Sequence, residues 1–296
     1  MKTISFFSEK GGVGKSSYSI MYASWLHHQH GLKVALADFN NRVYNYRRSE
    51  MANRRQFIES NPDTEIKPYD ESLTWPIVNC LSSDVREIRR NTGTNCPYAN
   101  WFENEVSNGR LKGYDVVVLD FPGSLTGGEY LQMMAIGDIG LTVIPTEKDE
   151  MTLQSTLTLS RMLQNQDKKH CVFITKAQLG LRNFRGQYFR LAKLLVERGM
   201  PVLPDLVSYS ERISTFDKVD IIRSTFGFPD FSTSEFEKGK DLGLENLFID
   251  VTRELASTQD LKGTDEVNLD FINEMTKHND GRQFNGSAFP EYEIKL

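Results

Sequence analysis

Short apolar runs alternate with longer amphipathic segments over most of the chain. The apolar runs are compact and rich in Val, Ile, Leu and Phe, which is typical of strands buried on both faces of a sheet. They occupy residues 3–8, 33–38, 114–120, 140–145, 171–175 and 200–203. Residues 16–30, 151–164 and 184–198 have the pattern of helices, and the first and last of these are followed by Gly31 and Gly199, as helix C-termini often are. The alternation predicts an α/β fold with a doubly wound, mostly parallel sheet flanked by helices.

Two regions have a weaker pattern. Residues 42–112 are polar with scattered aromatic residues, and we expect helices there that pack on one side of the sheet. After Ser257 the chain becomes polar and acidic and shows no strong period. The sequence therefore predicts one domain over residues 1–256 and an acidic C-terminal extension over residues 257–296.

Composition narrows the class of protein. The chain has 296 residues, of which 39% are hydrophobic and 25% charged, as expected for a soluble globular protein. Its net charge of −5 argues against a strongly basic nucleic-acid-binding protein, although a local basic patch is compatible with it.

Cys80, Cys96 and Cys171 form no CxxC pair, so we expect reduced thiols and no metal ribbon. No run has the roughly 18 apolar residues of a membrane span, and no signal peptide is recognisable, so we expect a cytoplasmic protein.

A glycine-rich segment, EKGGVGKSS at residues 9–17, lies between the first predicted strand and the first predicted helix. Glycines let the backbone approach a phosphate closely, and the free amides at a helix start attract anions. A lysine in such a loop reaches the β- and γ-phosphates, and the following hydroxyl can bind Mg²⁺. We therefore predict a P-loop for ATP and Mg²⁺. Its predicted nucleotide-binding residues are Gly11, Gly12, Val13, Gly14, Lys15, Ser16 and Ser17.

A carboxylate closes the predicted strand at residues 114–120. Asp120 ends the apolar run YDVVVLD and is followed by Phe-Pro-Gly. A carboxylate at the end of a buried strand beside a phosphate loop is well placed to support a magnesium ion. We predict that Ser16 and Asp120 form the metal site.

The form of the loop resembles one family in particular. Glu9 stands where the ordinary Walker loop has a glycine, and Lys10 precedes the two glycines. This KGGVGKS form resembles the deviant Walker motif of the ParA/MinD ATPases. The resemblance implies that Lys10 reaches the nucleotide of a partner subunit and that ATP binding produces a homodimer. It covers roughly residues 1–255 and is most specific at residues 9–17.

The second strand departs from the family pattern. The family usually has Asp-x-Asp-Pro-Gln where this chain has Asp38, Phe39, Asn40, Asn41 and Arg42. The resemblance implies that Lys10, Lys15, Asp38 and Asn40 are the catalytic positions. An amide can hydrogen-bond the attacking water but cannot accept its proton, so Asn40 predicts slow ATP hydrolysis. The departure also suggests a divergent, partition-type member, such as one carried by a conjugative or mobile element.

Several partners are compatible with the sequence. Basic residues interleaved with Tyr44 and Tyr46 can bind DNA nonspecifically, although a solvated charged helix face explains them equally well. These residues are Arg42, Arg47, Arg48, Arg54 and Arg55, with a second set at Arg182, Arg185 and Arg190. The resemblance adds a small activating partner protein. The amphipathic stretch 266–278 is acidic on its polar face, so we expect it to dock on protein and not on a membrane.

Two classes of function remain open. The first is a ParA-like switch that binds Mg·ATP, dimerises, hydrolyses ATP slowly and serves DNA partitioning or the maintenance of a conjugative element. The second is a metabolic enzyme of the same fold group, such as a dethiobiotin-synthetase-like ATP-dependent ligase. The cysteine positions disfavour a nitrogenase-iron-protein-like role, and the single phosphate loop disfavours an arsenite-pump-like role.

Overall fold

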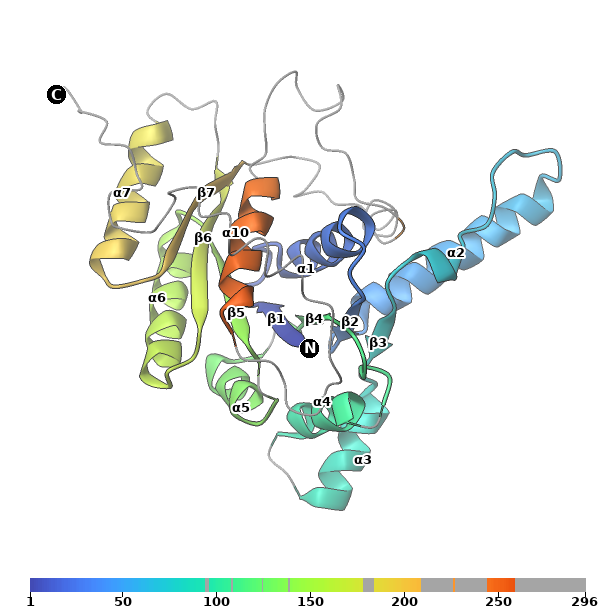
Figure 1. The fold of residues 1–296 in the computed structure, drawn as a ribbon, viewed down its shortest axis with the longest axis horizontal. Helices are drawn as coiled ribbons and strands as arrows, with labels where there is room; N and C mark the ends of the chain where they lie inside the picture. Colours follow the sequence, from blue (N-terminus) through green and yellow to red (C-terminus); the bar gives the residue numbers. More distant parts are fainter. Residues whose placement is uncertain are drawn as a thin grey trace.

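A parallel sheet forms the centre of the molecule and helices cover both of its faces (Figure 1). The structure is a computed structural model, and it describes residues 1–93, 96–107, 109–123, 125–137, 139–177, 184–208, 226 and 244–258. The strands in chain order are β1 Lys2–Phe6, β2 Val34–Asp38, β3 Ile77–Asn79, β4 Val116–Asp120, β5 Leu141–Thr146, β6 His170–Ala177 and β7 Val202–Ser208.

The seven strands of this sheet lie in the order β3-β2-β4-β1-β5-β6-β7, and every neighbouring pair is parallel. The chain leaves β1 for one half of the sheet and crosses to the other half at β5. In open parallel sheets, ligands bind at the carboxyl ends of the strands where the strand order switches in this way. The expected α/β fold is confirmed, and its switch point lies at β4, β1 and β5.

Helices fill the connections between strands. They are α1 Lys15–Ser24, α2 Arg42–Ser60, α3 Ser82–Thr92, α4 Pro97–Ser107, α5 Gly127–Gly137, α6 Glu150–Asn165, α7 Phe184–Glu197 and α10 Leu244–Ala256. A π-helical segment η1 (Trp25–Gln29) and a 3₁₀ turn η2 (Glu71–Leu73) complete the described elements. Side chains from α1 and α10 pack into one apolar core, and those from α4, α5, α6 and α7 pack into the other.

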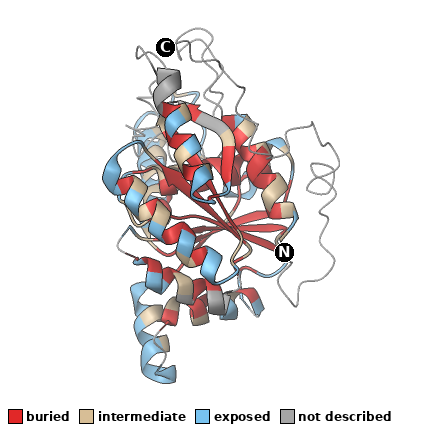
Figure 2. Cartoon of the chain, turned by 90° about the vertical axis from the view of Figure 1, so that its left-hand side faces the viewer, coloured by how far each residue is buried: buried red, intermediate tan, exposed pale blue. Residues whose placement is uncertain are grey.

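The strands separate the two cores by simple alternation. In β4, Val116 and Val118 belong to the core beneath α1 and α10, whereas Val117 and Leu119 belong to the opposite core. All five residues of β4 are buried, and Figure 2 shows the central strands as continuously buried. A near-continuous apolar run is what a strand covered on both faces requires.

The sequence pattern located the main strands correctly and missed some details. β3 has three residues, too few to show a period, and it was not predicted. β7 continues past Pro204 to Ser208, farther than the expected end at residue 203. The first helix was expected over residues 16–30. It begins at Lys15 and changes to π-helical geometry at Trp25, and the chain then turns at Gly31 with a φ of 68°.

The region 42–112 contains β3 and three helices, of which α2 departs most from the expectation. It was expected to pack on the sheet, but it extends away from the body of the molecule (Figure 1). Only Val43, Arg47 and Met51 of its residues are buried. We refer to residues 42–73, which comprise α2 and the chain that returns to η2, as the arm.

The C-terminal part of the described chain is tied to the sheet. α10 contributes Leu247, Phe248 and Val251 to the core, and the Lys2 ammonium donates to the carbonyls of Ala256 and Thr258. Apart from Ser257 and Thr258, the predicted extension lies outside the described residues, and so does the amphipathic stretch 266–278. None of the helices in the described ranges combines the length and the apolar character that crossing a bilayer requires.

Candidate nucleotide-binding site

The loop between β1 and α1 leaves a set of backbone amides without partners. Gly12 and Gly14 have φ values of 80° and 92°, which L-residues with a side chain rarely adopt. Gly14 is the N-cap of α1, which has neither a capping side chain nor an acidic residue in its first turn. Within the described residues, the amides of Gly11 to Lys15 donate to no acceptor. Unpaired amides at a helix N-terminus form a binding site for an anion such as a phosphate group.

Lys15 is buried beneath this loop. Its Nζ donates to the carbonyl oxygens of Ser8 and Lys10, at 2.7 Å in each case. Burial lowers the pKa of Lys15, and the nearby Asp120 carboxylate opposes that effect. The ammonium therefore lies inside the loop, where it is poorly solvated and where an anionic ligand would be a favourable new partner.

Ser16 and Asp120 meet at the start of α1. Ser16 Oγ donates to Asp120 Oδ2 at 3.0 Å, although the two residues are far apart in the sequence. The Asp120 side chain is fully buried, and its Oδ1 has no hydrogen-bond partner within the described part of the chain. Burial, and secondly the neighbouring Asp38, raise the pKa of Asp120 to about 7. A buried carboxylate oxygen without a partner beside a hydroxyl fits a magnesium ion, which binds one or two such ligands together with phosphate oxygens.

Asp38 lies beside Asp120 in the sheet but has a different set of contacts. The two residues are register partners at the ends of β2 and β4. Asp38 Oδ1 accepts from the Asn40 amide and Oδ2 accepts from the Tyr44 amide, both at 2.9 Å. Both oxygens therefore hold the turn that starts α2. Burial raises the pKa of Asp38, and these backbone hydrogen bonds oppose the rise.

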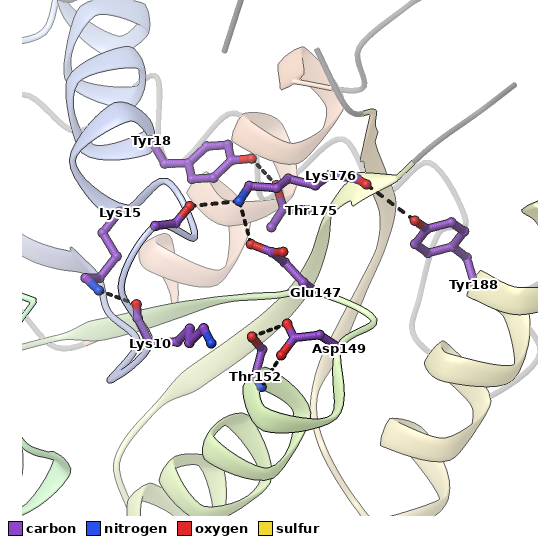
Figure 3. A network of polar contacts seen from close by, with 10 residues as sticks. Lys10, Lys15, Tyr18, Glu147, Asp149, Thr152, Thr175, Lys176 and Tyr188 are labelled. Carbon is purple, nitrogen blue, oxygen red and sulfur yellow. Dashed lines mark hydrogen bonds and ion pairs between the residues drawn. The ribbon is translucent and has the colours of Figure 1, made fainter. Parts of the chain in front are cut away.

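Asn40 and Lys10 lie at the same edge of the sheet. Asn40 is half-buried in the turn after β2. The Lys10 side chain points away from Lys15 and toward Asp149 at the start of α6 (Figure 3). The pKa of Asp149 is lowered mainly by its hydrogen bonds with Thr152, and the Lys10 charge lowers it further. The structure thus brings Lys15, Ser16, Asp38 and Asp120 together under the loop, with Lys10 on its outer side.

Three residues of the site were not predicted from the sequence. Glu9 accepts from the Gly127 amide at the start of α5 and from Ser155 Oγ of α6. Lys176, at the end of β6, donates to the Gly12 carbonyl and forms an ion pair with Glu147, both at 2.8 Å. Lys176 and Glu147 each follow an apolar run at the end of a strand, which was a usable signal for both.

The arginines of the arm are less available than the sequence suggested. Arg47 is buried, lies over the Trp75 ring at 4.6 Å and donates to the Trp75 carbonyl. Arg54 lies over Tyr69 and donates to the Lys67 carbonyl, and Arg55 pairs with Glu71. The arm contains six basic and six acidic residues, so its formal net charge is zero. The expectation of a basic cluster that includes Arg47 is wrong, because this side chain is part of the core at the base of the arm.

The second basic set is only partly described. Arg190 is exposed on α7, whereas Arg182 and the side chain of Arg185 lie outside the described residues. Cys80, Cys96 and Cys171 are buried, and no disulfide bond joins any of the three. Within the described ranges, no group of three or more His, Cys, Asp or Glu side chains could hold a metal ion.

The loop, the switch-point sheet and the Ser16–Asp120 pair define a P-loop nucleotide-binding protein. The profile of the CobQ/CobB/MinD/ParA nucleotide-binding domain family matches residues 4–220. The chain therefore belongs to this family and is a nucleotide-binding ATPase of the ParA/MinD type. A search of curated protein sequences finds no significant match.

Several solved structures are similar to this chain at low sequence identity. A putative plasmid partition protein from Borrelia burgdorferi bound to AMPPNP is 15% identical, with a TM-score of 0.53 over 84% of this chain and 99% of that chain. The MinD cell division protein from Aquifex aeolicus is 13% identical, with a TM-score of 0.49 over 88% of this chain and 100% of that chain. A cobyrinic acid a,c-diamide synthase from Mycobacterium smegmatis with bound ADP and magnesium is 16% identical, with a TM-score of 0.48 over 75% and 91%.

Proposed function

We propose that this protein is a nucleotide-dependent dimer switch that binds Mg·ATP in the loop at residues 9–17 and serves DNA partitioning or the maintenance of a conjugative element. The observation that carries the binding step is the row of amides from Gly11 to Lys15, which have no acceptor among the described residues, above a buried ammonium. Ser16 and Asp120 would hold the magnesium ion, which when bound neutralises charge on the phosphates. Asp38 supports the site indirectly, because its oxygens hold the turn that carries Asn40.

The proposed hydrolysis step is slow. Phosphoryl transfer depends on the position of the water and on stabilisation of charge, and the side chain proposed to orient the water is the amide of Asn40. This amide can orient a water but cannot remove its proton. A bound state that persists because hydrolysis is slow is what a switch requires, since partners must act while the dimer exists.

The dimer step rests on Lys10. Its side chain points away from the loop's own interior, and the ammonium has no hydrogen-bond or ion-pair partner within the described residues. Lys15, by contrast, is held by two carbonyls. One lysine is therefore positioned to bind the nucleotide of its own subunit, and the other is free to bind the nucleotide of a second subunit.

The test is the molar mass in solution by light scattering, with ATP, with ADP and without nucleotide. We expect a dimer only with ATP and Mg²⁺. Lys10→Ala should bind ATP but remain a monomer, while Lys193→Ala, in an exposed ion pair on α7, should behave as the wild type. A Lys10→Ala protein that still dimerises with ATP would contradict the proposed trans role of this residue.

DNA is the partner that the partition role requires. Since the arm is neutral overall, the better candidates are Arg86, Arg89 and Arg90, which are exposed on α3 at helical spacing. We expect ATP-dependent DNA binding that weakens steeply with salt, because binding to phosphates releases counterions. Replacing these three arginines by alanine should reduce it more than replacing Arg42, Arg48 and Arg55. DNA binding that responds to neither ATP nor salt would contradict the partition role.

One observation favours an ATP-dependent ligase as a second candidate function. The matching family description covers CobQ and CobB as well as MinD and ParA. ATP turnover stimulated by a small carboxylic acid would favour the ligase, and turnover stimulated by DNA would favour the switch.

A further inference from the structure

Lys176 lies at an unusual point of the backbone. It is the penultimate residue of β6, and its φ is +56°, in the left-handed region that residues with side chains rarely adopt. The register between β6 and β7 shifts between Ile174 and Ala177, so the ladder is irregular there. Tyr188 of α7 donates its hydroxyl to the Lys176 carbonyl at 3.3 Å, which holds the strained residue in place. Strain of this kind persists where the surrounding structure fixes it, and it is common at functional sites.

The strained backbone directs the Lys176 side chain onto the phosphate loop (Figure 3). The ammonium donates to the Gly12 carbonyl at 2.8 Å and pairs with Glu147 Oε1 at 2.8 Å. Glu147 follows the end of β5, so the ends of β5 and β6 and the loop after β1 meet at one ammonium group. Both side chains are partly shielded from solvent, with exposed fractions of 32% for Lys176 and 23% for Glu147.

The geometry of a peptide unit gives this contact a consequence for binding. The Gly12 carbonyl and the Val13 N–H belong to the same planar unit and point in opposite directions. By holding the carbonyl on the outer side of the loop, Lys176 fixes the direction of the Val13 N–H on the other side. That N–H has no acceptor within the described residues, and it is one of the amides proposed to bind phosphate.

Lys15 holds the loop in the same way two peptide units earlier, because its contact with the Lys10 carbonyl fixes the Gly11 N–H. The two lysines differ in what nucleotide binding would do to them. Lys15 lies inside the loop and is proposed to turn to the phosphates, which would release the carbonyls of Ser8 and Lys10. Lys176 contacts the loop from the outside and can keep its contact.

We propose that Lys176 is a positioning residue that keeps the phosphate loop ready for binding, with Glu147 orienting its ammonium. This inference rests on the proposed nucleotide site, and Lys176 itself is not proposed to touch the phosphates. Its backbone strain is the means by which the side chain reaches Gly12.

The experiment measures the Kd for ADP and ATP with Mg²⁺ and the Tm of the nucleotide-free protein. Lys176→Met, which keeps the apolar stem but removes the donor, should weaken binding by about 10-fold, the effect of one charge-assisted hydrogen bond. Lys176→Arg should recover most of the affinity, and Glu147→Gln should lose about 3-fold. Lys193→Met, in the exposed pair with Glu197, is the matched control and should bind as the wild type does.

Lys176→Gly separates positioning from stability. Glycine adopts a φ of +56° without steric cost, so its Tm should not fall, yet its affinity should fall as far as that of Lys176→Met. The Val13 amide resonance of nucleotide-free protein should also shift in Lys176→Met and not in Lys193→Met. Wild-type affinity in both Lys176→Met and Lys176→Gly would overturn the inference and leave the nucleotide site intact. Failure of the wild type to bind any nucleotide would instead overturn the proposed function.

Discussion

The charged residues at the edge of the sheet that carries the candidate nucleotide-binding site differ from those of the arm in burial and in contacts. At the edge, Lys15, Asp38 and Asp120 are buried, and the hydrogen bond between Ser16 and Asp120 joins segments far apart in the sequence. Along the arm, the partners that Arg48, Arg54 and Arg55 have among the described residues all belong to the arm itself. Burying a charge costs free energy unless an opposite charge or hydrogen bonds compensate it, whereas exposed pairs contribute little. The comparison leads us to expect that the buried charges at the edge serve ligand binding, and that the exposed charges of the arm can vary without harm to the fold.

The largest expected effect is at Asp120. Burial and Asp38 raise its pKa from 3.8 to about 7, so the folded state holds a proton that the unfolded state releases. This group therefore destabilises the fold progressively as pH rises from about 4 to about 7, by an amount on the order of a few kcal/mol. We predict that Asp120→Asn, without nucleotide and in EDTA, has a higher Tm than the wild type at pH 8. The difference should shrink toward pH 5.

Thermal unfolding at several pH values measures that difference. Asp115→Asn is a suitable control, because Asp115 is also a buried aspartate but accepts the Lys33 amide at the opposite end of β4. If Asp120→Asn were less stable than the wild type at pH 8, the carboxylate would be a structural requirement and the contrast between the two regions would fail.

An intermediate effect is expected at Arg47, where the arm joins the body. This side chain is 8% exposed, and burial lowers its pKa to about 9. Arg47→Ala removes the stacking on Trp75 and a hydrogen bond to its carbonyl, so we predict a loss of about 2 kcal/mol of unfolding free energy. Arg48→Ala, one residue farther along α2, provides the control and should change stability by less than about 0.5 kcal/mol. Equal losses of unfolding free energy for the two variants in a urea titration would show that the base of the arm and its exposed face do not differ in their contribution to stability.

The smallest effect is expected at Arg55 in the outer part of the arm. Its pair with Glu71 has an N–O distance of 3.9 Å, and the two side chains are 61% and 67% exposed. Exposed pairs of this kind contribute between zero and about 1 kcal/mol, so Arg55→Ala should leave the Tm within about 2 °C of the wild type. The same substitution should leave the Kd for ATP unchanged. A clear loss of ATP affinity would mean that the arm contributes to the nucleotide site.

The sequence predicted the parts of this structure that depend on local pattern. The strands β1, β2, β4, β5 and β6 follow from apolar runs, and the loop at residues 9–17 from its glycines and lysines. The meeting of Ser16 with Asp120 was predicted because Asp120 ends a buried strand beside the phosphate loop. These predictions needed no information about distant contacts.

The features of the structure that were not predicted depend on tertiary contacts, which the local sequence pattern does not encode. Arg47 resembles the other arginines of α2 in sequence, and only the position of Trp75 makes it a buried residue. Lys176 reaches Gly12 because of one left-handed residue, and a lysine is not a residue type for which φ > 0 is expected. The sequence also did not predict that α2 extends away from the sheet, because too few of its residues are apolar to show which face is buried.

The most direct test of the account is the dependence of ATP affinity on Mg²⁺, measured by calorimetry in the wild type and in Ser16→Ala. We predict saturable ATP binding by the wild type that Mg²⁺ tightens by about 10-fold or more, and no such tightening in Ser16→Ala, which should still bind ATP without metal. Absence of ATP binding in the wild type, or an equal response to Mg²⁺ in the two proteins, would contradict the assignment of this loop and its Ser16–Asp120 pair as the Mg·ATP site.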